Sequence, residues 1–290
     1  MSKSSSPKFD VHQEITNRIV DALENAGEFQ LPWIANKSGS FARPVNIASR
    51  KPYNGVNIVS LWVSAQASQY PSNVWGTYRQ WQDRGAQVRK GEKSSLIIFY
   101  KDIEPDEQDG SSEDGFQRRF VARASRVFNV AQVDGYVIDE PDTCIDPVSP
   151  CERAEQVIAA SGAVIREGGS SAYYSIKDDA ITMPDRFRFT GTATSDASEG
   201  WYSTLLHELT HWSGADHRLA RTFGERFGDD AYAMEEMVAE LGAAFLCGDL
   251  GITIEPRPDH ADYIGHWLRI LKGDRKAIFT AASAANKAAE

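Results

Sequence analysis

Apolar residues recur at helical spacing along several stretches of the chain. Ile15, Ile19 and Leu23 form one apolar stripe, and Asp10 and Gly27 stand where the helix that carries it would begin and end. Further helices are predicted by the same periodicity over residues 54–66, 72–85, 151–162, 201–213 and 229–248.

Other stretches have the composition of β-strands. Residues 94–101 and 118–130 are rich in β-branched and aromatic residues, and we expect them to pair as antiparallel strands. The acidic segment 102–115 between them is predicted to be a solvated loop. The pattern of residues 171–184 predicts a hairpin that turns at Asp178 and Asp179. Helices combined with a small antiparallel sheet indicate the α+β class.

The charge changes sign between the two halves of the chain. The formal net charge is -10 for all 290 residues, but residues 31–101 carry ten lysines and arginines and only two acidic residues. Residues 141–290 carry 14 basic and 24 acidic residues. We therefore expect two domains, over residues 1–140 and 151–290, joined by a proline-containing linker at 141–150.

Composition narrows the class of protein. With 290 residues, of which 41% are hydrophobic, the chain can bury cores of domain size. We expect neither a signal peptide nor a membrane segment, because no apolar run approaches the required length of about 18 residues. The three cysteines are too few for a disulfide framework and lack Cys-x-x-Cys spacing. A cytoplasmic protein fits these features best.

The helix predicted over residues 201–213 carries two histidines on its polar side. Successive residues turn by about 100°, which places Trp201, Leu205 and Leu209 on the buried side. His207 and His211 then project together from the opposite side. Histidines at positions i and i+4 of a rigid helix can bind one zinc ion through two nitrogens.

Glu208 lies between these histidines in the sequence HELTH. It points roughly 60 to 100° away from them around the helix, so it could reach a water molecule at the metal but is poorly placed as a ligand. Zinc lowers the pKa of water towards about 7, and a carboxylate can then take up the proton while the water attacks a carbonyl. The motif therefore predicts a zinc metallopeptidase in which Glu208 is the general base.

The third ligand is expected from the second long helix, over residues 229–248. Glu236 and Glu240, one turn apart, lie among small apolar residues, where an uncompensated carboxylate would be costly to bury. We expect Glu236 to be a metal ligand and Glu240 to hold a ligating histidine by its other ring nitrogen. Glu235 is the alternative ligand from the same helix. Two histidines and a glutamate also suit manganese or iron(II).

His217 offers a competing third ligand. The stretch HELTHWSGADH fits the longer pattern HExxHxxGxxH, in which Gly214 would turn the chain and His217 would bind the metal. That pattern normally comes with a downstream methionine turn. The methionines that follow His217 are Met234 and Met237, and both lie inside a helical pattern. We therefore favour Glu236 as the third ligand.

These stretches together resemble a known family. The resemblance to the zincin-type metallopeptidase domain of ArdC-type antirestriction proteins, which are found on conjugative plasmids, lies in HELTHWSGADHRLAR and YAMEEMVAELGAAFL. The resemblance to that family's N-terminal single-stranded DNA binding domain lies in NIASRKPYNGVNIVSLW, WGTYRQWQDRGAQVRKGEKSSLIIFYK and SRVFNVAQVDG. It implies His207 and His211 as ligands, Glu208 as base and one glutamate of the pair at 235–236 as third ligand.

The N-terminal half has the side chains that single-stranded DNA requires. Such DNA is held by a positive groove along its phosphates and by aromatic rings on which bases stack. Trp75 and Trp81, at helical spacing, fit a core better than a stacking surface. We expect binding without sequence preference and with a steep salt dependence. The expected DNA contacts are Arg43, Arg50, Lys51, Tyr53, Arg79, Arg89, Lys90 and Lys93.

Two functions are compatible with these features. In the first, the N-terminal domain holds single-stranded DNA, and the zinc site cleaves an unidentified protein brought near it, which protects incoming plasmid DNA during conjugation. In the second, the protein coats and shields the DNA, and the zincin domain is structural or cryptic. The family resemblance implies antirestriction under both.

Overall fold

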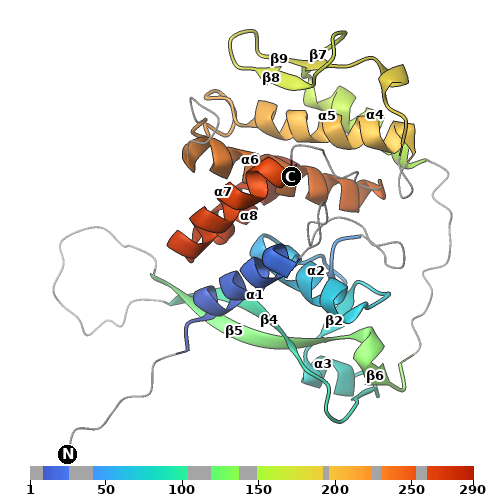
Figure 1. Cartoon of the computed structure of the whole chain (residues 1–290). Coiled ribbons are helices and arrows are strands. Elements are labelled where there is room, and N and C mark those ends of the chain that lie inside the picture. The colour runs from blue at the N-terminus through green and yellow to red at the C-terminus, as the bar shows by residue number, and fades with distance from the viewer. Residues whose placement is uncertain are drawn as a thin grey trace, which may run out of the picture.

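Two groups of helices with three small sheets make up the described chain, and they confirm the expected two-domain α+β fold (Figure 1). None of the helices in the described part is long and apolar enough to cross a membrane. The structure is a computed structural model, which describes residues 9–25, 42–103, 119–136, 149–191, 196–223, 230–252 and 260–290.

The N-terminal half is built on the predicted pair of antiparallel strands. β4 (Ser95–Ile103) and β5 (Arg119–Asn129) pair along their whole length. Most of the acidic segment predicted as a loop between them, residues 104–115, lies outside the described residues. Two short strands, β1 (Val45–Asn46) and β2 (Val74–Gly76), extend the sheet in the order β1-β2-β5-β4.

Helices α1 (Val11–Asn25) and α2 (Val56–Ser68) pack on this sheet and against each other. The predicted apolar stripe of α1 is buried, and the first turn of the helix is capped by Asp10, whose Oδ1 accepts hydrogen bonds from two backbone N–H groups. The stripe consists of Ile15, Ile19 and Leu23.

Side chains of α2 satisfy the outer backbone groups of β4, which is an edge strand. Nδ2 of Asn57 donates to the carbonyl of Ile98 (2.9 Å), and the N–H of Ile98 donates to Oδ1 of Asn57 (2.8 Å). Oγ of Ser60 donates to the carbonyl of Leu96 (2.8 Å). A covered edge of this kind is protected from pairing with another chain.

The stretch predicted as one helix over residues 72–85 is divided. Its first part forms β2, which pairs with β5, and only Tyr78–Gln82 is helical (α3). The side chain of Thr77 accepts a hydrogen bond from the N–H of Gln80, and the Gln80 side chain accepts one from the N–H of Thr77. The single-helix prediction was wrong because pairing with a distant strand outweighs the local helical periodicity.

A second, smaller core lies against α3. Trp81 is fully buried in it, and a Cβ on Gly76 would lie 2.5 Å from the Ile47 side chain, so only glycine fits there. Trp75 is fully buried in the main core, so both tryptophans are core residues, as predicted. The elements that complete this region are β3 (Gln87–Val88), η1 (Val130–Gln132) and β6 (Val133–Asp134).

The C-terminal half begins with α4 (Pro150–Ser161), as predicted, and Ser149 caps its N-terminus. The linker predicted at 141–150 lies outside the described residues up to 148. The predicted hairpin is present as β8 (Tyr173–Ser175) and β9 (Ala180–Met183), which are antiparallel. A strand that the sequence pattern did not predict, β7 (Val164–Glu167), pairs in parallel with β9, so the sheet order is β7-β9-β8.

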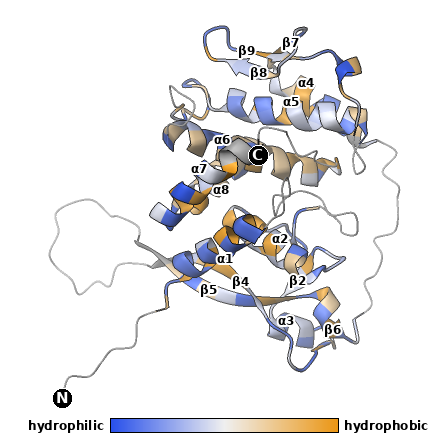
Figure 2. Ribbon diagram, in the orientation of Figure 1, coloured by the Kyte–Doolittle hydropathy of each residue, from blue (hydrophilic) through white to orange (hydrophobic). Residues whose placement is uncertain are grey.

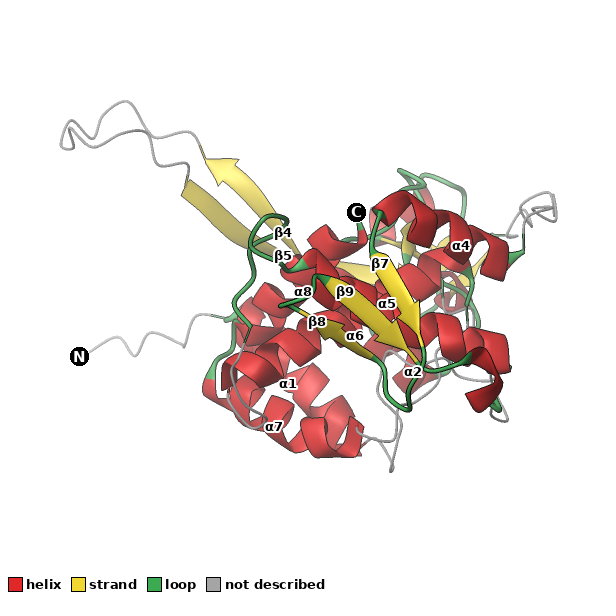
Figure 3. Ribbon diagram, turned by 90° about the horizontal axis from the view of Figure 1, so that it is seen from above, coloured by secondary structure: helices red, strands yellow, loops and turns green. Residues whose placement is uncertain are grey.

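The remaining helices of the described C-terminal half are α5 (Ala197–Ser213), α6 (Asp230–Leu250), α7 (His260–Gly273) and α8 (Ala277–Ala289), and a short turn, η2 (Arg186–Arg188), precedes α5. α5 starts earlier than predicted because Asp196 forms a capping box with Glu199. Seen from above, the β7-β9-β8 sheet lies over α5 (Figure 3).

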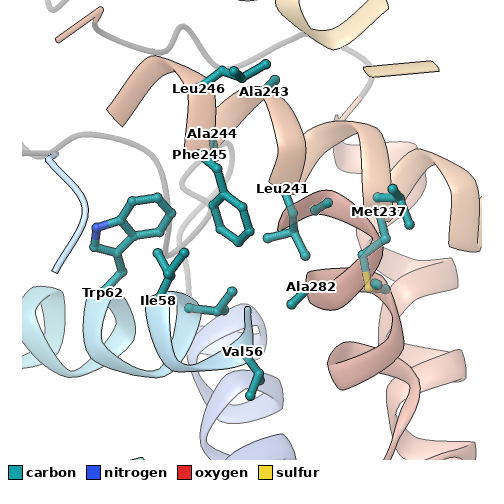
Figure 4. Close-up of a cluster of buried hydrophobic side chains, with 14 of the residues drawn as sticks. Val56, Ile58, Trp62, Met237, Leu241, Ala243, Ala244, Phe245, Leu246 and Ala282 are labelled. Carbon is teal, nitrogen blue, oxygen red and sulfur yellow. The ribbon is translucent and has the colours of Figure 1, made fainter. Parts of the chain in front are cut away.

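The two halves share one hydrophobic core. The ring centroids of Trp62 on α2 and Phe245 on α6 are 5.8 Å apart, and Ile58, Leu241 and Ala282 belong to the same buried cluster (Figure 4). α1 also packs against α7, and α2 against α8. Apolar residues are concentrated on α2 and α6 where the halves meet (Figure 2). The halves are therefore held in a fixed relation by burial of apolar surface.

The shared core predicts a large loss of stability for Phe245→Ala. The ring is fully buried, and removal of such a ring costs about 3–5 kcal/mol in the free energy of unfolding. Urea unfolding followed by tryptophan fluorescence and circular dichroism should show one transition, moved to lower urea. Phe187→Ala is the control, because that ring is 79% exposed. Two separate transitions, of which only one moves, would contradict a shared core.

Candidate functional site

α5 and α6 approach each other closely at one point. A Cβ on Gly242 would lie 2.5 Å from Cγ2 of Thr210, so a larger residue would force the helices apart. Thr210 can sit there because its hydroxyl donates to the carbonyl of Leu206 within its own helix (2.8 Å). The close approach sets the side of α5 that carries His207 and His211 against the glutamates of α6.

Three side chains converge between the helices. Nε2 of His207 and Nε2 of His211 are 3.1 Å apart, and the carboxylate oxygens of Glu236 lie 3.6 Å from the first nitrogen and 3.4 Å from the second. Among the described residues, these are the three whose possible ligand atoms all lie within 4.8 Å of one another. Two imidazoles and a carboxylate so arranged can hold a divalent metal ion.

The other ring nitrogens of both histidines face further glutamates. Nδ1 of His207 is 3.4 Å from Oε2 of Glu240, and Nδ1 of His211 is 3.1 Å from Oε1 of Glu235. Carboxylates in these positions fix the orientation of the rings, so that both Nε2 atoms point to the same place. Glu240 thus lies at the other ring nitrogen of a candidate ligand, as expected from the sequence. Glu235 and Glu236 lie on opposite sides of the His211 ring.

Arg221 holds Glu235 in this position. Its Nε and Nη2 each donate to one carboxylate oxygen at 2.9 Å, and its Nη1 donates to Oγ of Ser213 at 2.9 Å. A carboxylate engaged on both oxygens is poorly disposed to bind a metal as well. Arg221 was not among the residues predicted from the sequence, because it lies beyond the end of α5, where no periodicity indicates its contacts.

Residues 214–217, GADH, form the turn that leads to Arg221 and do not supply a third histidine ligand. A Cβ on Gly214 would lie 2.7 Å from Nη2 of Arg221, so glycine is required for the arginine to fold back. His217 is exposed, and its Nε2 lies 3.4 Å from Oδ2 of Asp179 in the β8–β9 turn and 2.7 Å from Nη1 of Arg218. His217 therefore lies outside the cluster of His207, His211 and Glu236.

The cluster is electrostatically suited to a cation. Burial opposes the charged form of His211, but hydrogen bonds to Glu235 and Glu236 outweigh it and raise the pKa of the imidazole to about 10. Burial likewise opposes ionisation of Glu236, but hydrogen bonds from His207 and His211 lower its pKa. The pKa of Glu235 is lowered by hydrogen bonds from His211 and Arg221 that outweigh burial. Anionic carboxylates at this depth require positive charge beside them.

A pocket of about 220 Å³ opens onto the cluster. Glu208, which is 4% exposed, borders it together with His207, His211 and Glu236. Residues 172–174 and Ile176, in and beside β8, also line it. The pocket therefore combines a possible metal site, a buried carboxylate and a strand edge.

Similarity to solved structures identifies the family. The chain is 36% identical to the antirestriction protein ArdC of plasmid R388 in its metal-free crystal structure, with a TM-score of 0.77, and the match covers 97% of this chain and 96% of that one. The chain belongs to the ArdC antirestriction family. Residues 9–128 match the N-terminal domain of anti-restriction factor ArdC, and residues 152–284 match the zincin-like metallopeptidase family.

Further relatives agree with this membership. A structure of the same R388 ArdC protein described as Mn(II)-bound is 34% identical, with a TM-score of 0.76, over 97% of this chain and 96% of that one. The protein named Uncharacterized protein y4eC of Sinorhizobium fredii (strain NBRC 101917 / NGR234) is 46% identical over 97% of this chain and 91% of its own length. DNA primase TraC of Escherichia coli is 35% identical over 95% of this chain, which spans only 26% of that primase.

Two of the expected DNA contacts are buried within the ArdC fold. Arg43 is 8% exposed and pairs through Nε with Oδ1 of Asp249 on α6 (2.9 Å), with its guanidinium over the ring of Phe245. Tyr53 is 6% exposed, and its hydroxyl accepts a hydrogen bond from Asn46. Arg43 therefore joins the two halves and is not free to contact phosphates, and the ring of Tyr53 is too little exposed for a base to stack on it.

The other expected contacts lie at the surface. Arg89 is engaged with Glu92 (2.8 Å) and Asp134 (3.4 Å), which reduces its free positive charge. The other expected contacts in the described residues are exposed and have no such ion pair: Arg50, Lys51, Arg79, Lys90 and Lys93.

The geometry predicts how strongly each of three substitutions lowers the affinity for Zn²⁺ or Mn²⁺. Isothermal titration calorimetry measures this affinity. Glu236→Ala removes a ligand and should have the largest effect. Arg221→Ala should lower affinity by about 10–100-fold, because Glu235 would no longer be held on His211. His217→Ala should leave affinity unchanged. If His217→Ala had the largest effect, the longer histidine pattern would describe the site instead.

Metal binding should release a proton from His211. With its pKa raised to about 10, the ring is protonated at pH 7.5 without metal, and a nitrogen must lose its proton to bind a metal ion. Apparent affinity should therefore rise with pH up to that value. Calorimetry at pH 7.5 in buffers of different ionisation enthalpy should give about one proton released per ion. Release of none would exclude a protonated ligand at this position.

Proposed function

We propose that this protein is an antirestriction protein that binds single-stranded DNA without sequence preference through residues 1–140 and cleaves a protein at the α5–α6 site of residues 151–290. Together these activities would protect incoming plasmid DNA in the cytoplasm during conjugation. The observation that carries the peptidase part is the convergence of His207, His211 and Glu236 beside Glu208 in one pocket.

His207, His211 and Glu236 would hold a divalent ion. This donor set favours zinc, and manganese or iron(II) accept it as well. When bound, such an ion polarises a carbonyl and lowers the pKa of water. Glu240 and Glu235 act on the other ring nitrogens and keep both Nε2 atoms directed towards the same point.

Glu208 is the side chain that we assign to proton transfer. It is almost fully buried yet borders the pocket, so it can reach a water molecule there without being a ligand. A carboxylate in this position takes a proton from the attacking water and delivers it to the leaving amine, which typically contributes about 10²–10⁴-fold to the rate.

A peptide substrate would lie along β8. This strand is at the edge in the order β7-β9-β8, and it borders the pocket. Tyr173 at the start of the strand and Ile176 just after its end are 52% and 60% exposed. An extended peptide can pair with an exposed strand edge through backbone hydrogen bonds. Such pairing would place one peptide bond of the substrate next to Glu208.

Positive charge at the surface supports the proposed binding of DNA. Exposed cations in the N-terminal half attract phosphates, and binding of this kind weakens steeply with salt. The similar segment within a protein named DNA primase TraC also points to work on DNA. The cations that we propose are Arg50, Lys51, Arg79, Lys90 and Lys93, with Arg89 in a lesser role because of its two ion pairs.

A second candidate is a protein that shields DNA and in which the zincin domain is structural. The observation in its favour is that the exposed cations of the N-terminal half lie outside the α5–α6 pocket, so that DNA binding does not require catalysis.

Glu208→Gln separates the two candidates. The variant should bind metal and single-stranded DNA as the unchanged protein does but lose about 10²–10⁴-fold in cleavage of a casein probe by the metal-loaded protein with DNA present. Conjugative transfer into a restricting recipient, relative to a restriction-deficient one, should fall to the level without the protein. Asp216→Asn, an exposed carboxylate just after α5, is the matched control.

The outcomes are distinguishable. Full protection by Glu208→Gln would favour shielding and remove the functional claim for proteolysis. Failure of the unchanged, metal-loaded protein to cleave the casein probe under any condition would remove the peptidase assignment itself.

A further inference from the structure

α8 presents two different faces. The residues of one face are buried against α6 and neighbouring helices, and most of them are alanines, which permits close packing. The other face carries Lys276, Thr280, Ser283 and Lys287, which are spaced by four, three and four residues and are all exposed. Two lysines about 16 Å apart along the helix therefore flank a row of small hydroxyl side chains. The buried face consists of Ala277, Ile278, Ala281, Ala282 and Ala285.

The exposed face of α8 forms one wall of a groove between the two halves of the protein. The groove has a volume of about 1600 Å³, which exceeds the size of a typical small-molecule pocket and can take a stretch of polymer. Residues 51–57 and β4 also line it, as do Arg218 and Arg221. Figure 1 shows α8 between the layer of α1 and α2 and the layer of α5 and α6.

The free charge in this groove is positive. Lys51, Lys276 and Lys287 line it, and none of them is paired with an acidic side chain within the described residues. Arg218 and Arg221 are neutralised by Asp179 and Glu235. One acidic residue, Glu290, is among the described lining residues, and its Oε1 accepts a hydrogen bond from Asn286.

Aromatic rings stand at the same groove. Tyr100 of β4 is 54% exposed, and its hydroxyl lies 3.3 Å from Nε2 of His12. The His12 ring is in turn 4.7 Å from the ring of Phe279 on α8. Phosphate-binding cations beside partly exposed rings are what a sequence-tolerant site for single-stranded nucleic acid requires.

The wall formed by residues 51–57 adds backbone donors. α2 begins in this wall just after its N-cap residue Gly55, and no side chain caps its N-terminus. A Cβ on Gly55 would meet no atom within 4 Å, so the space in front of it is open. Together with Lys51, the first turn of α2 reinforces the attraction for anions that the two lysines of α8 create on the other side.

We propose that single-stranded DNA lies in this groove, between Lys51 of the N-terminal half and Lys276 and Lys287 of α8. The inference rests on the proposed DNA-binding function and changes where that function resides: the metallopeptidase half supplies one wall of the site. A strand in the groove runs past Arg221, which holds Glu235 against His211 of the α5–α6 site.

The test compares two double variants of the full chain with the same change in charge. Lys276→Ala with Lys287→Ala removes the groove lysines. Lys177→Ala with Lys272→Ala removes two exposed lysines that do not line the groove, of which Lys272 pairs with Glu24. Binding of fluorescein-labelled oligothymidine is followed by fluorescence anisotropy over a series of salt concentrations, and thermal unfolding checks that each variant is folded.

The groove variant should weaken binding by about ten-fold or more and lower the slope of log affinity against log salt by about 1.4, because each lost phosphate contact contributes about 0.7. The control should change neither quantity appreciably. Equal effects of the two folded variants, or an effect only of Lys90→Ala with Lys93→Ala, would overturn the groove site while leaving DNA binding intact. Absence of binding by the unchanged protein would instead overturn the proposed function.

Discussion

The close approach of α5 and α6 at Gly242 and Thr210 is the constraint on which the rest of the site depends. It brings two imidazoles and several carboxylates, most of them buried, together beside one pocket. Burial of so many charged groups is unfavourable unless each finds a partner. Here the histidines pair with Glu235, Glu236 and Glu240 through different ring nitrogens. A divalent cation at the two Nε2 atoms would compensate the remaining negative charge.

The shared core fixes the position of the two domains relative to each other. Because α2 packs on α8 and contacts Phe245 of α6 through Trp62, the N-terminal domain cannot move freely relative to the zincin-like domain. The groove between the domains is therefore a fixed feature of the surface. Arg43 adds to the same contact, since its buried guanidinium forms an ion pair with the exposed Asp249 of the other half. Sites on the two halves are held at a constant distance by this packing.

One turn connects the groove with the α5–α6 site. Arg218 and Arg221 border the groove, while the guanidinium of Arg221 holds Glu235 against His211. The net charge of -10 for the whole chain conceals this arrangement, because the acidic residues of the C-terminal half include the buried glutamates of the site. The positive surface that remains is local, which is the form of charge that binds a polyanion.

The sequence by itself determined the features that depend on neighbours in the chain. The buried stripe of α1 follows from apolar periodicity, and the pairing of His207 with His211 follows from one helical turn. The β4–β5 pair and the β8–β9 hairpin follow from composition and turn residues.

Only the tertiary structure decided the features that depend on residues far apart in the chain. It divided residues 72–85 between a strand and a helix, because β5 offers β2 a partner. It placed Glu236 rather than Glu235 at the two Nε2 atoms, because Arg221 occupies both oxygens of Glu235. It also buried Arg43 and exposed the lysines of α8 to a groove. Local periodicity sets which face of an element is polar, but the neighbour that meets this face depends on how distant elements pack.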